Sequence, residues 1–109
     1  MELNLEGKRA LITGSSSGIG VAIAEMLAAE GVSVVVNGRD SARVDAIAKR
    51  LADQGHRAAT ACGDLSTAKG CAAVAEAANA AFGGIDILVN NAGGSACLLY
   101  TSPSPRDRG

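Results

Sequence analysis

Aromatic side chains are almost missing from this chain of 109 residues, which has no tryptophan, one tyrosine and one phenylalanine. Hydrophobic residues still make up 48% of the sequence, so a core has to be assembled from Ala, Val, Ile and Leu. Charged residues amount to only 19%, which excludes the high charge and low hydropathy of a disordered chain. Small aliphatic side chains suit helices that pack closely on a sheet, and the composition therefore indicates one α/β domain.

Further absences exclude several classes of function. No apolar run approaches the roughly 20 residues that span a bilayer, and Glu2 and Glu6 stand where a secretory signal would be basic, so we expect a cytoplasmic protein without a membrane segment. The formal net charge is −1 and the Lys and Arg residues are scattered, which disfavours nucleic acid as a partner. The three cysteines form no CxxC pair and His56 is the only histidine, so neither a disulfide framework nor a metal site is expected.

The most informative stretch is the turn at residues 13–20, which reads TGSSSGIG. It joins an apolar run at residues 10–12, typical of a buried strand, to an alanine-rich amphipathic segment. Its glycines, Gly14, Gly18 and Gly20, allow a tight reversal and a close approach of the backbone to a ligand. Because N–H groups at the start of a helix lack intrahelical partners, an anionic diphosphate is the expected occupant of this turn.

Strand and helix patterns alternate along the first 94 residues. Strands are predicted at residues 8–13, 33–37, 57–62 and 85–89, and helices at 18–30, 41–54 and 66–82. Parallel strands joined by helical crossovers form a doubly wound α/β sheet, which binds ligands beyond the carboxyl ends of its strands. The segments just beyond those ends are residues 13–20, 37–40, 62–65 and 90–94.

Each helix is expected to turn one apolar face toward the sheet. On the first helix this face consists of Ile19, Ala22, Ile23, Met26 and Leu27. On the third helix it consists of Cys71, Val74, Ala75, Ala78 and Phe82. Asp40 or Ser41 is predicted to cap the second helix, and Ser66 the third.

A second motif, Asn90-Asn91-Ala92-Gly93, follows the fourth predicted strand. With both motifs present, the chain resembles the short-chain dehydrogenase/reductase family, whose glycine motif is TGxxxGIG and whose fourth strand ends in NNAG. The resemblance covers residues 5 to 94. It implies a Rossmann-like doubly wound parallel sheet, truncated here after the fourth strand, in which residues 1–94 are the N-terminal part of an NAD(P)-binding domain.

The resemblance also implies an activity and a set of cofactor-binding residues. The activity is NADP(H)-dependent oxidation of an alcohol or reduction of a carbonyl on a small-molecule substrate by hydride transfer, and the full-length protein is expected to be a homo-oligomer, either a dimer or a tetramer. The residues assigned to the cofactor are Gly14, Ser15, Ser16, Ser17, Gly18, Ile19, Gly20, Asn37, Arg39, Asp64, Leu65, Asn91, Ala92 and Gly93. The serine hydroxyls are expected to donate to phosphate oxygens, and Asn90 to hold neighbouring strands together.

Arg39 leads to the prediction of NADP(H) over NAD(H). A carboxylate at the tip of the second strand would accept from a ribose 2′-hydroxyl and repel a 2′-phosphate, but the tip reads Asn37-Gly38-Arg39. The cationic fork of Arg39 suits a phosphate, although it could also be a solvated surface charge, and Asp40 stands at about the spacing of a ribose-binding acid. Asp64 either contacts the adenine ring, as the resemblance implies, or helps to cap the third helix.

No catalytic residue is assigned in this chain. The family uses a tyrosine as general acid or base with a lysine four residues later, whereas Tyr100 is followed at that spacing by Ser104. Residues 95–109 hold both prolines and look like a translated sequencing adaptor, the alternative being a genuine proline-containing loop. We therefore expect the cofactor-binding front half of an oxidoreductase, and the alternative is a noncatalytic dinucleotide-binding module.

Overall fold

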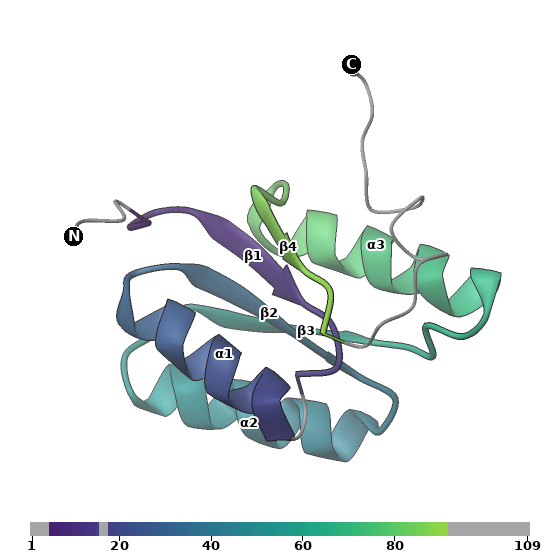
Figure 1. The fold of residues 1–109 in the computed structure, drawn as a ribbon, viewed down its shortest axis with the longest axis horizontal. Coiled ribbons are helices and arrows are strands. Elements are labelled where there is room, and N and C mark those ends of the chain that lie inside the picture. The colour runs from purple at the N-terminus through teal and green to yellow at the C-terminus, as the bar shows by residue number, and fades with distance from the viewer. Residues whose placement is uncertain (1–4, 16–17, 92–109) are drawn as a thin grey trace.

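The structure is a computed structural model, and it describes residues 5–15 and 18–91. Seven elements alternate along the chain, and four parallel strands form one sheet in the order β3-β2-β1-β4 (Figure 1). The elements are β1 (Arg9–Ile12), α1 (Gly18–Ala29), β2 (Ser33–Gly38), α2 (Ser41–Asp53), β3 (Ala58–Cys62), α3 (Ala68–Phe82) and β4 (Ile87–Val89). This is the Rossmann-like doubly wound arrangement predicted from the sequence, with every predicted strand and helix in place.

Alternation along the strands divides the core into two layers. Ala10 and Ile12 of β1 point to the side covered by α1 and α2, whereas Leu11 between them points to the side covered by α3. In Figure 1 the two groups of helices lie on opposite faces of the sheet. The chain reverses its winding direction between β1 and β4, so the carboxyl ends of these two strands form the switch point at which sheets of this kind bind ligands.

The structure shows which residues cap the second and third helices, for which the sequence predicted Asp40 or Ser41 and Ser66. Asp40 caps α2, because its Oδ1 accepts hydrogen bonds from the N–H groups of Ala42 and Arg43. The prediction that Ser66 caps the third helix is wrong. The cap is Thr67, whose Oγ1 accepts from the Gly70 N–H at 2.9 Å. Ser66 lies one residue before that position and donates to Asp64 instead.

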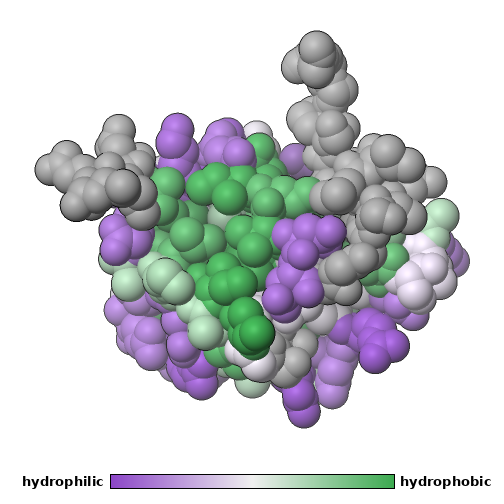
Figure 2. All heavy atoms as spheres, viewed as in Figure 1, coloured by the Kyte–Doolittle hydropathy of each residue, from purple (hydrophilic) through white to green (hydrophobic). Residues whose placement is uncertain are grey.

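The predicted apolar face of α1 is also partly wrong. The residues that α1 buries fully are Gly20, Ala24 and Ala28, while Ile19 is 73% and Met26 62% exposed. The helix approaches the sheet so closely that the smallest side chains occupy the line of contact, and larger ones are displaced to its flanks. Figure 2 shows a continuous apolar area on the face of the molecule where α1 and β4 lie.

The start of β4 is fixed to β1 by a single ion pair. Arg9 donates from its backbone N–H and from Nε to Oδ2 of Asp86, and from Nη2 to Oδ1, each at 2.9 Å. These hydrogen bonds lower the pKa of the Asp86 carboxyl to about 2. The Arg9–Asp86 pair stands one position before the first paired residues of the two strands, Ala10 and Ile87.

Candidate functional site

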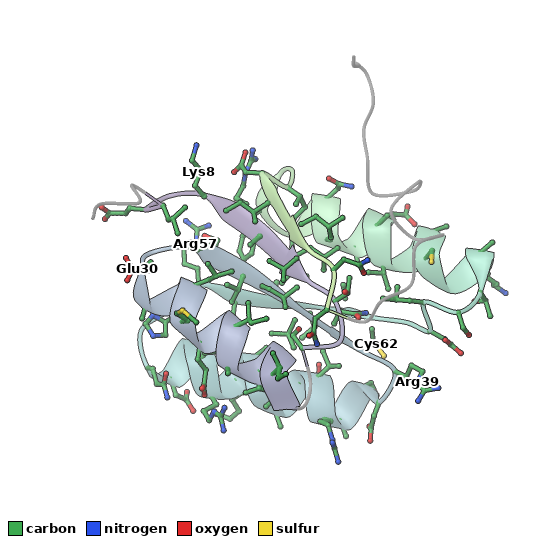
Figure 3. All side chains as sticks on the ribbon, in the orientation of Figure 1. Lys8, Glu30, Arg39, Arg57 and Cys62 are labelled. Carbon is green, nitrogen blue, oxygen red and sulfur yellow. The ribbon has the colours of Figure 1, made fainter. Side chains whose placement is uncertain are left out.

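The four strand ends bring most of the predicted site residues to one edge of the sheet. Residues 13–15 follow β1, Arg39 follows β2, residues 63–65 follow β3, and Asn90 and Asn91 follow β4. In Figure 3, Arg39 and Cys62 lie at this edge, and Lys8, Glu30 and Arg57 lie at the opposite one. Ser16, Ser17, Ala92 and Gly93 belong to the predicted site but lie outside the described residues.

Gly14 begins the turn with a backbone conformation that favours glycine, since its φ is +62°. Its peptide groups are held from two sides. The N–H donates to Asn37 Oδ1 at 2.8 Å, and the carbonyl oxygen accepts from Asn91 Nδ2 at 3.1 Å. The two asparagines come from the ends of β2 and β4, so the turn is held by both neighbours of β1 in the sheet.

Gly20 brings the first turn of α1 against this loop. A Cβ placed on Gly20 would lie 2.7 Å from Ser15 Cα and closer still to the Gly14 carbonyl oxygen. No side chain other than hydrogen fits there without moving backbone. The glycine motif therefore has a packing function at its last position, as the expected close helix–strand contact requires.

Ser15 and Asn37 point into the protein rather than toward solvent, with exposed fractions of 0% and 1%. Ser15 Oγ donates to the Ile12 carbonyl at 2.7 Å and accepts from the Asn37 N–H at 2.8 Å. Asn37 Nδ2 donates to the Ala61 carbonyl at 2.9 Å, and the Asn37 carbonyl accepts from the Ser15 N–H at 2.9 Å. These polar groups are thus satisfied internally, and the geometry does not support the expected contact between the Ser15 hydroxyl and phosphate.

The positive end of the α1 dipole lies at the carboxyl end of β1, where α1 begins. Gly18 and Ile19 are exposed, and the first turn contains no acidic residue that would neutralise the dipole. The first N–H groups of a helix have no intrahelical acceptor, so this end of α1 can bind an anion. Space beside Gly18 is open, since a Cβ added there would meet no atom within 4 Å.

Arg39 is exposed at the tip of β2, beside the end of β3. Its carbonyl oxygen accepts a weak hydrogen bond from Cys62 Sγ at 3.4 Å. The hydroxyl and N–H of Ser66 lower the pKa of Asp64, and the charge of Arg39 lowers it further. The charges of Arg39 and Asp64, which follow β2 and β3, therefore influence each other. Asp40, the competing candidate for the ribose, directs its Oδ1 to the first turn of α2.

Asp64 forms a tight turn at the start of α3. Its Oδ1 accepts from the Ser66 N–H at 2.9 Å and from Ser66 Oγ at 2.7 Å, while its carbonyl oxygen accepts from Thr67. This is a local structural function for Asp64 in the turn before α3, whose own cap is Thr67. The side chain of Leu65 packs partly buried against the core on the α3 side of the sheet.

Asn90 connects the ends of β1 and β4, as expected. Its Oδ1 lies 3.3 Å from Thr13 Oγ1, which is also 3.2 Å from the Val89 carbonyl oxygen. The Thr13 N–H donates to the same carbonyl at 3.0 Å. These contacts join the carboxyl ends of β1 and β4, and the next residue, Asn91, is exposed.

The described residues contain no cluster of three or more His, Cys, Asp or Glu side chains that could hold a metal ion. In the same part of the chain, no helix combines the length and the apolar composition that crossing a membrane requires.

A doubly wound parallel sheet with a glycine-rich turn and a helix N-terminus at its switch point defines a Rossmann-like protein. The family model described as short chain dehydrogenase matches residues 8–105, and the chain belongs to this family. An uncharacterized oxidoreductase of Bacillus subtilis, YvaG, is 46% identical over 95 residues, which are 85% of this chain and 34% of that protein.

Two solved structures are similar over the same region. L-sorbose reductase from Gluconobacter frateurii, complexed with NADPH and L-sorbose, has a TM-score of 0.81 at 47% identity and covers 85% of this chain and 36% of its own. Gluconate 5-dehydrogenase from Burkholderia cenocepacia, in complex with NADP and tartrate, has a TM-score of 0.76 at 43% identity and covers 82% and 35%. The chain thus spans about a third of the length of these proteins.

Proposed function

We propose that this chain is the cofactor-binding part of an NADP(H)-dependent oxidoreductase, which interconverts a carbonyl and an alcohol on a small molecule by hydride transfer. The observation that carries the proposal is the juxtaposition, at one sheet edge, of the glycine turn, the unneutralised start of α1 and the exposed Arg39. Solved members of the family that resemble this chain hold NADPH or NADP, which supports a nicotinamide dinucleotide as the cofactor.

Different residues are proposed to contact different parts of the cofactor. The glycine turn, where it leads into α1, binds the pyrophosphate, and Arg39 binds the 2′-phosphate of the adenine ribose. Asp64 and the backbone of Leu65 contact the adenine ring. Asn91 and the small residues Ala92 and Gly93 line the path of the nicotinamide ribose.

The cofactor preference is tested by the Arg39→Asp variant of the complete gene product. A carboxylate at this tip repels a 2′-phosphate and accepts from a 2′-hydroxyl, so the ratio of NADPH to NADH affinity should fall at least about tenfold, as expected for loss of a charge-assisted hydrogen bond. The matched control is Arg43→Asp, which makes the same change of charge on the exposed part of α2. An unchanged ratio in Arg39→Asp would show that Arg39 is a surface charge.

The remaining parts of the proposal concern the complete protein. Its catalytic residues are not assigned in this chain. Its action on a small-molecule substrate and its assembly as a homo-oligomer rest on the family resemblance, and its place in the cytoplasm rests on the acidic residues Glu2 and Glu6 and the short apolar runs of the sequence. Sequencing the source DNA past codon 94 tests the first point. A reading frame that continues to a YxxxK motif supports the oxidoreductase, whereas a stop after a gene-encoded tail supports a noncatalytic nucleotide-binding module.

A further inference from the structure

Asn37 and Ser15 are buried polar residues to which the proposed hydride-transfer chemistry assigns no role. All the hydrogen bonds described for their side chains are to the protein itself, and they run to the ends of three strands: to Ile12 and Gly14 at the end of β1, to the Asn37 N–H in β2, and to Ala61 in β3. We infer that Asn37 is a positioning residue. It acts with Ser15 to fix the first part of the glycine turn, Gly14 and Ser15, so that the pyrophosphate binds only where the turn leads into α1. This inference rests on the proposed binding of NADP(H).

The backbone donors at the start of the turn are already bonded within the protein. The Gly14 N–H is taken by Asn37 Oδ1, and the Ser15 N–H is taken by the Asn37 carbonyl oxygen. A phosphate could reach these donors only by breaking hydrogen bonds of 2.8 and 2.9 Å to Asn37, which is 1% exposed. Among the described residues of the turn, the donors available to the ligand are therefore those at the start of α1.

The backbone of Asn37 and the N–H of Gly14 are held in place by different groups. The backbone of Asn37 pairs with β3, where Asn37 is opposite Ala61 and Gly38 is opposite Cys62. Removal of the side chain deletes the bond from Asn37 Nδ2 to the Ala61 carbonyl but leaves this backbone pairing, which keeps the tip of β2, and Arg39 beyond it, in place. The Gly14 N–H, in contrast, is fixed by the side-chain amide of Asn37.

Because α1 packs directly against the turn, the position of the helix depends on the position of the turn. Gly20 packs on Gly14 and Ser15 so closely that a methyl group does not fit. A turn that loses its bond to Asn37 can rotate its first peptide and change the position of α1 relative to β1. The affinity for a pyrophosphate would fall, while a ligand that binds only beyond β2 and β3 would be unaffected.

The experiment compares two ligands on Asn37→Ala in the complete gene product by isothermal titration calorimetry. NADPH contains the pyrophosphate, whereas adenosine 2′-monophosphate carries only the adenine, the ribose and the 2′-phosphate. We expect the Kd of NADPH to rise about tenfold or more, as for loss of a hydrogen bond with a buried partner, and that of adenosine 2′-monophosphate to change less than about twofold. The control is Asn79→Ala, because Asn79 is exposed on α3 and donates only to Ala75 of its own helix.

A second variant covers the case in which Asn37→Ala does not fold. Ser15→Ala removes the hydroxyl that joins Ile12 to Asn37 without opening a large cavity, and it should show the same selective loss of NADPH affinity. Equal weakening of both ligands, or wild-type NADPH affinity in both variants, would overturn the inference. A wild-type protein that binds neither ligand would overturn the proposed function instead.

Discussion

Gly20 offers a direct test of the geometry on which the site depends. In the Gly20→Ala variant the new methyl group would lie 2.7 Å from Ser15 Cα and 2.8 Å from the Gly14 carbonyl carbon. Carbon atoms in contact prefer about 3.5–4.0 Å, so the start of α1 and the turn would have to separate by roughly 0.8 Å. Both neighbours are backbone atoms, and a rotamer change cannot relieve the overlap. The donors at the start of α1 would move with the helix.

The expected cost of this overpacking is about 1–3 kcal/mol in the free energy of unfolding. A fall in stability alone would not distinguish a damaged site from a weakened fold. The matched control is therefore Gly55→Ala, at the turn after α2. Gly55 has a φ of +92° and no atom within 4 Å of an added Cβ, so alanine there costs about 1–2 kcal/mol of backbone strain without displacing a neighbour.

The assay measures both variants of the complete gene product by thermal denaturation and by fluorescence titration with NADPH. Both variants should melt below the wild type. Only Gly20→Ala should lose NADPH affinity, by at least about tenfold, because a displacement of roughly 1 Å at a binding site is costly. If Gly20→Ala binds NADPH as tightly as Gly55→Ala does, the close contact between α1 and the turn has no part in binding, and the reasoning is refuted.

Two further predictions concern stability. Asp86 has a folded-state pKa of about 2, below its ordinary value of about 4, so its pair with Arg9 stabilises the fold above about pH 4 and the contribution disappears as the pH falls toward 2. Acid denaturation followed by circular dichroism should therefore separate Asp86→Asn from the wild type at neutral pH and bring the two curves together near pH 2; a constant difference would contradict this. Thr67→Ala should lower the free energy of unfolding in urea by about 1 kcal/mol, since it removes the cap of α3. Ser66→Ala should cost less, and equal losses would argue against Thr67 as the cap.

The sequence was sufficient to predict the fold because its strongest patterns are local. The run of three valines at residues 34–36 can only be a buried strand, and all three are fully buried in β2. Gly31, Gly55 and Gly83 end the three helices or the turns that follow them, and each has a positive φ. Alternating strands and helices with such boundaries leave a doubly wound sheet as the simplest topology.

The face that α1 buries could not be predicted from hydropathy. A periodic pattern ranks side chains by their apolar surface and assumes that the largest ones face the core. Here the approach of α1 to the turn is set by Gly20, so Ala24 and Ala28 continue the line of contact at intervals of four residues. The pattern that could have indicated this is the spacing of the small residues, in step with the last glycine of the motif.

The cap of α3 shows a similar limit at a smaller scale. Asp64, Ser66 and Thr67 are all good capping residues, and only the geometry decides which of them accepts from the helix. Gly70 decides it, because a Cβ there would lie 2.7 Å from the Asp64 carbonyl carbon. The first turn of α3 is thus pressed against the Asp64 peptide, and the Thr67 hydroxyl is the one within reach of the Gly70 N–H.

At the site, too, sequence pattern predicts which residues lie at the strand ends, but packing decides which of them are exposed. The polar residues Ser15, Asn37, Arg39 and Asn91, at or just beyond the ends of parallel strands, are predicted from the sequence to bind the ligand, since that is where ligands bind. The structure divides them into two kinds. Arg39 and Asn91 are exposed, whereas Ser15 and Asn37 use their polar atoms to connect β1, β2 and β3. A strand end that carries a ligand needs such connections, because a loop held only by its own backbone could not present donors at fixed positions.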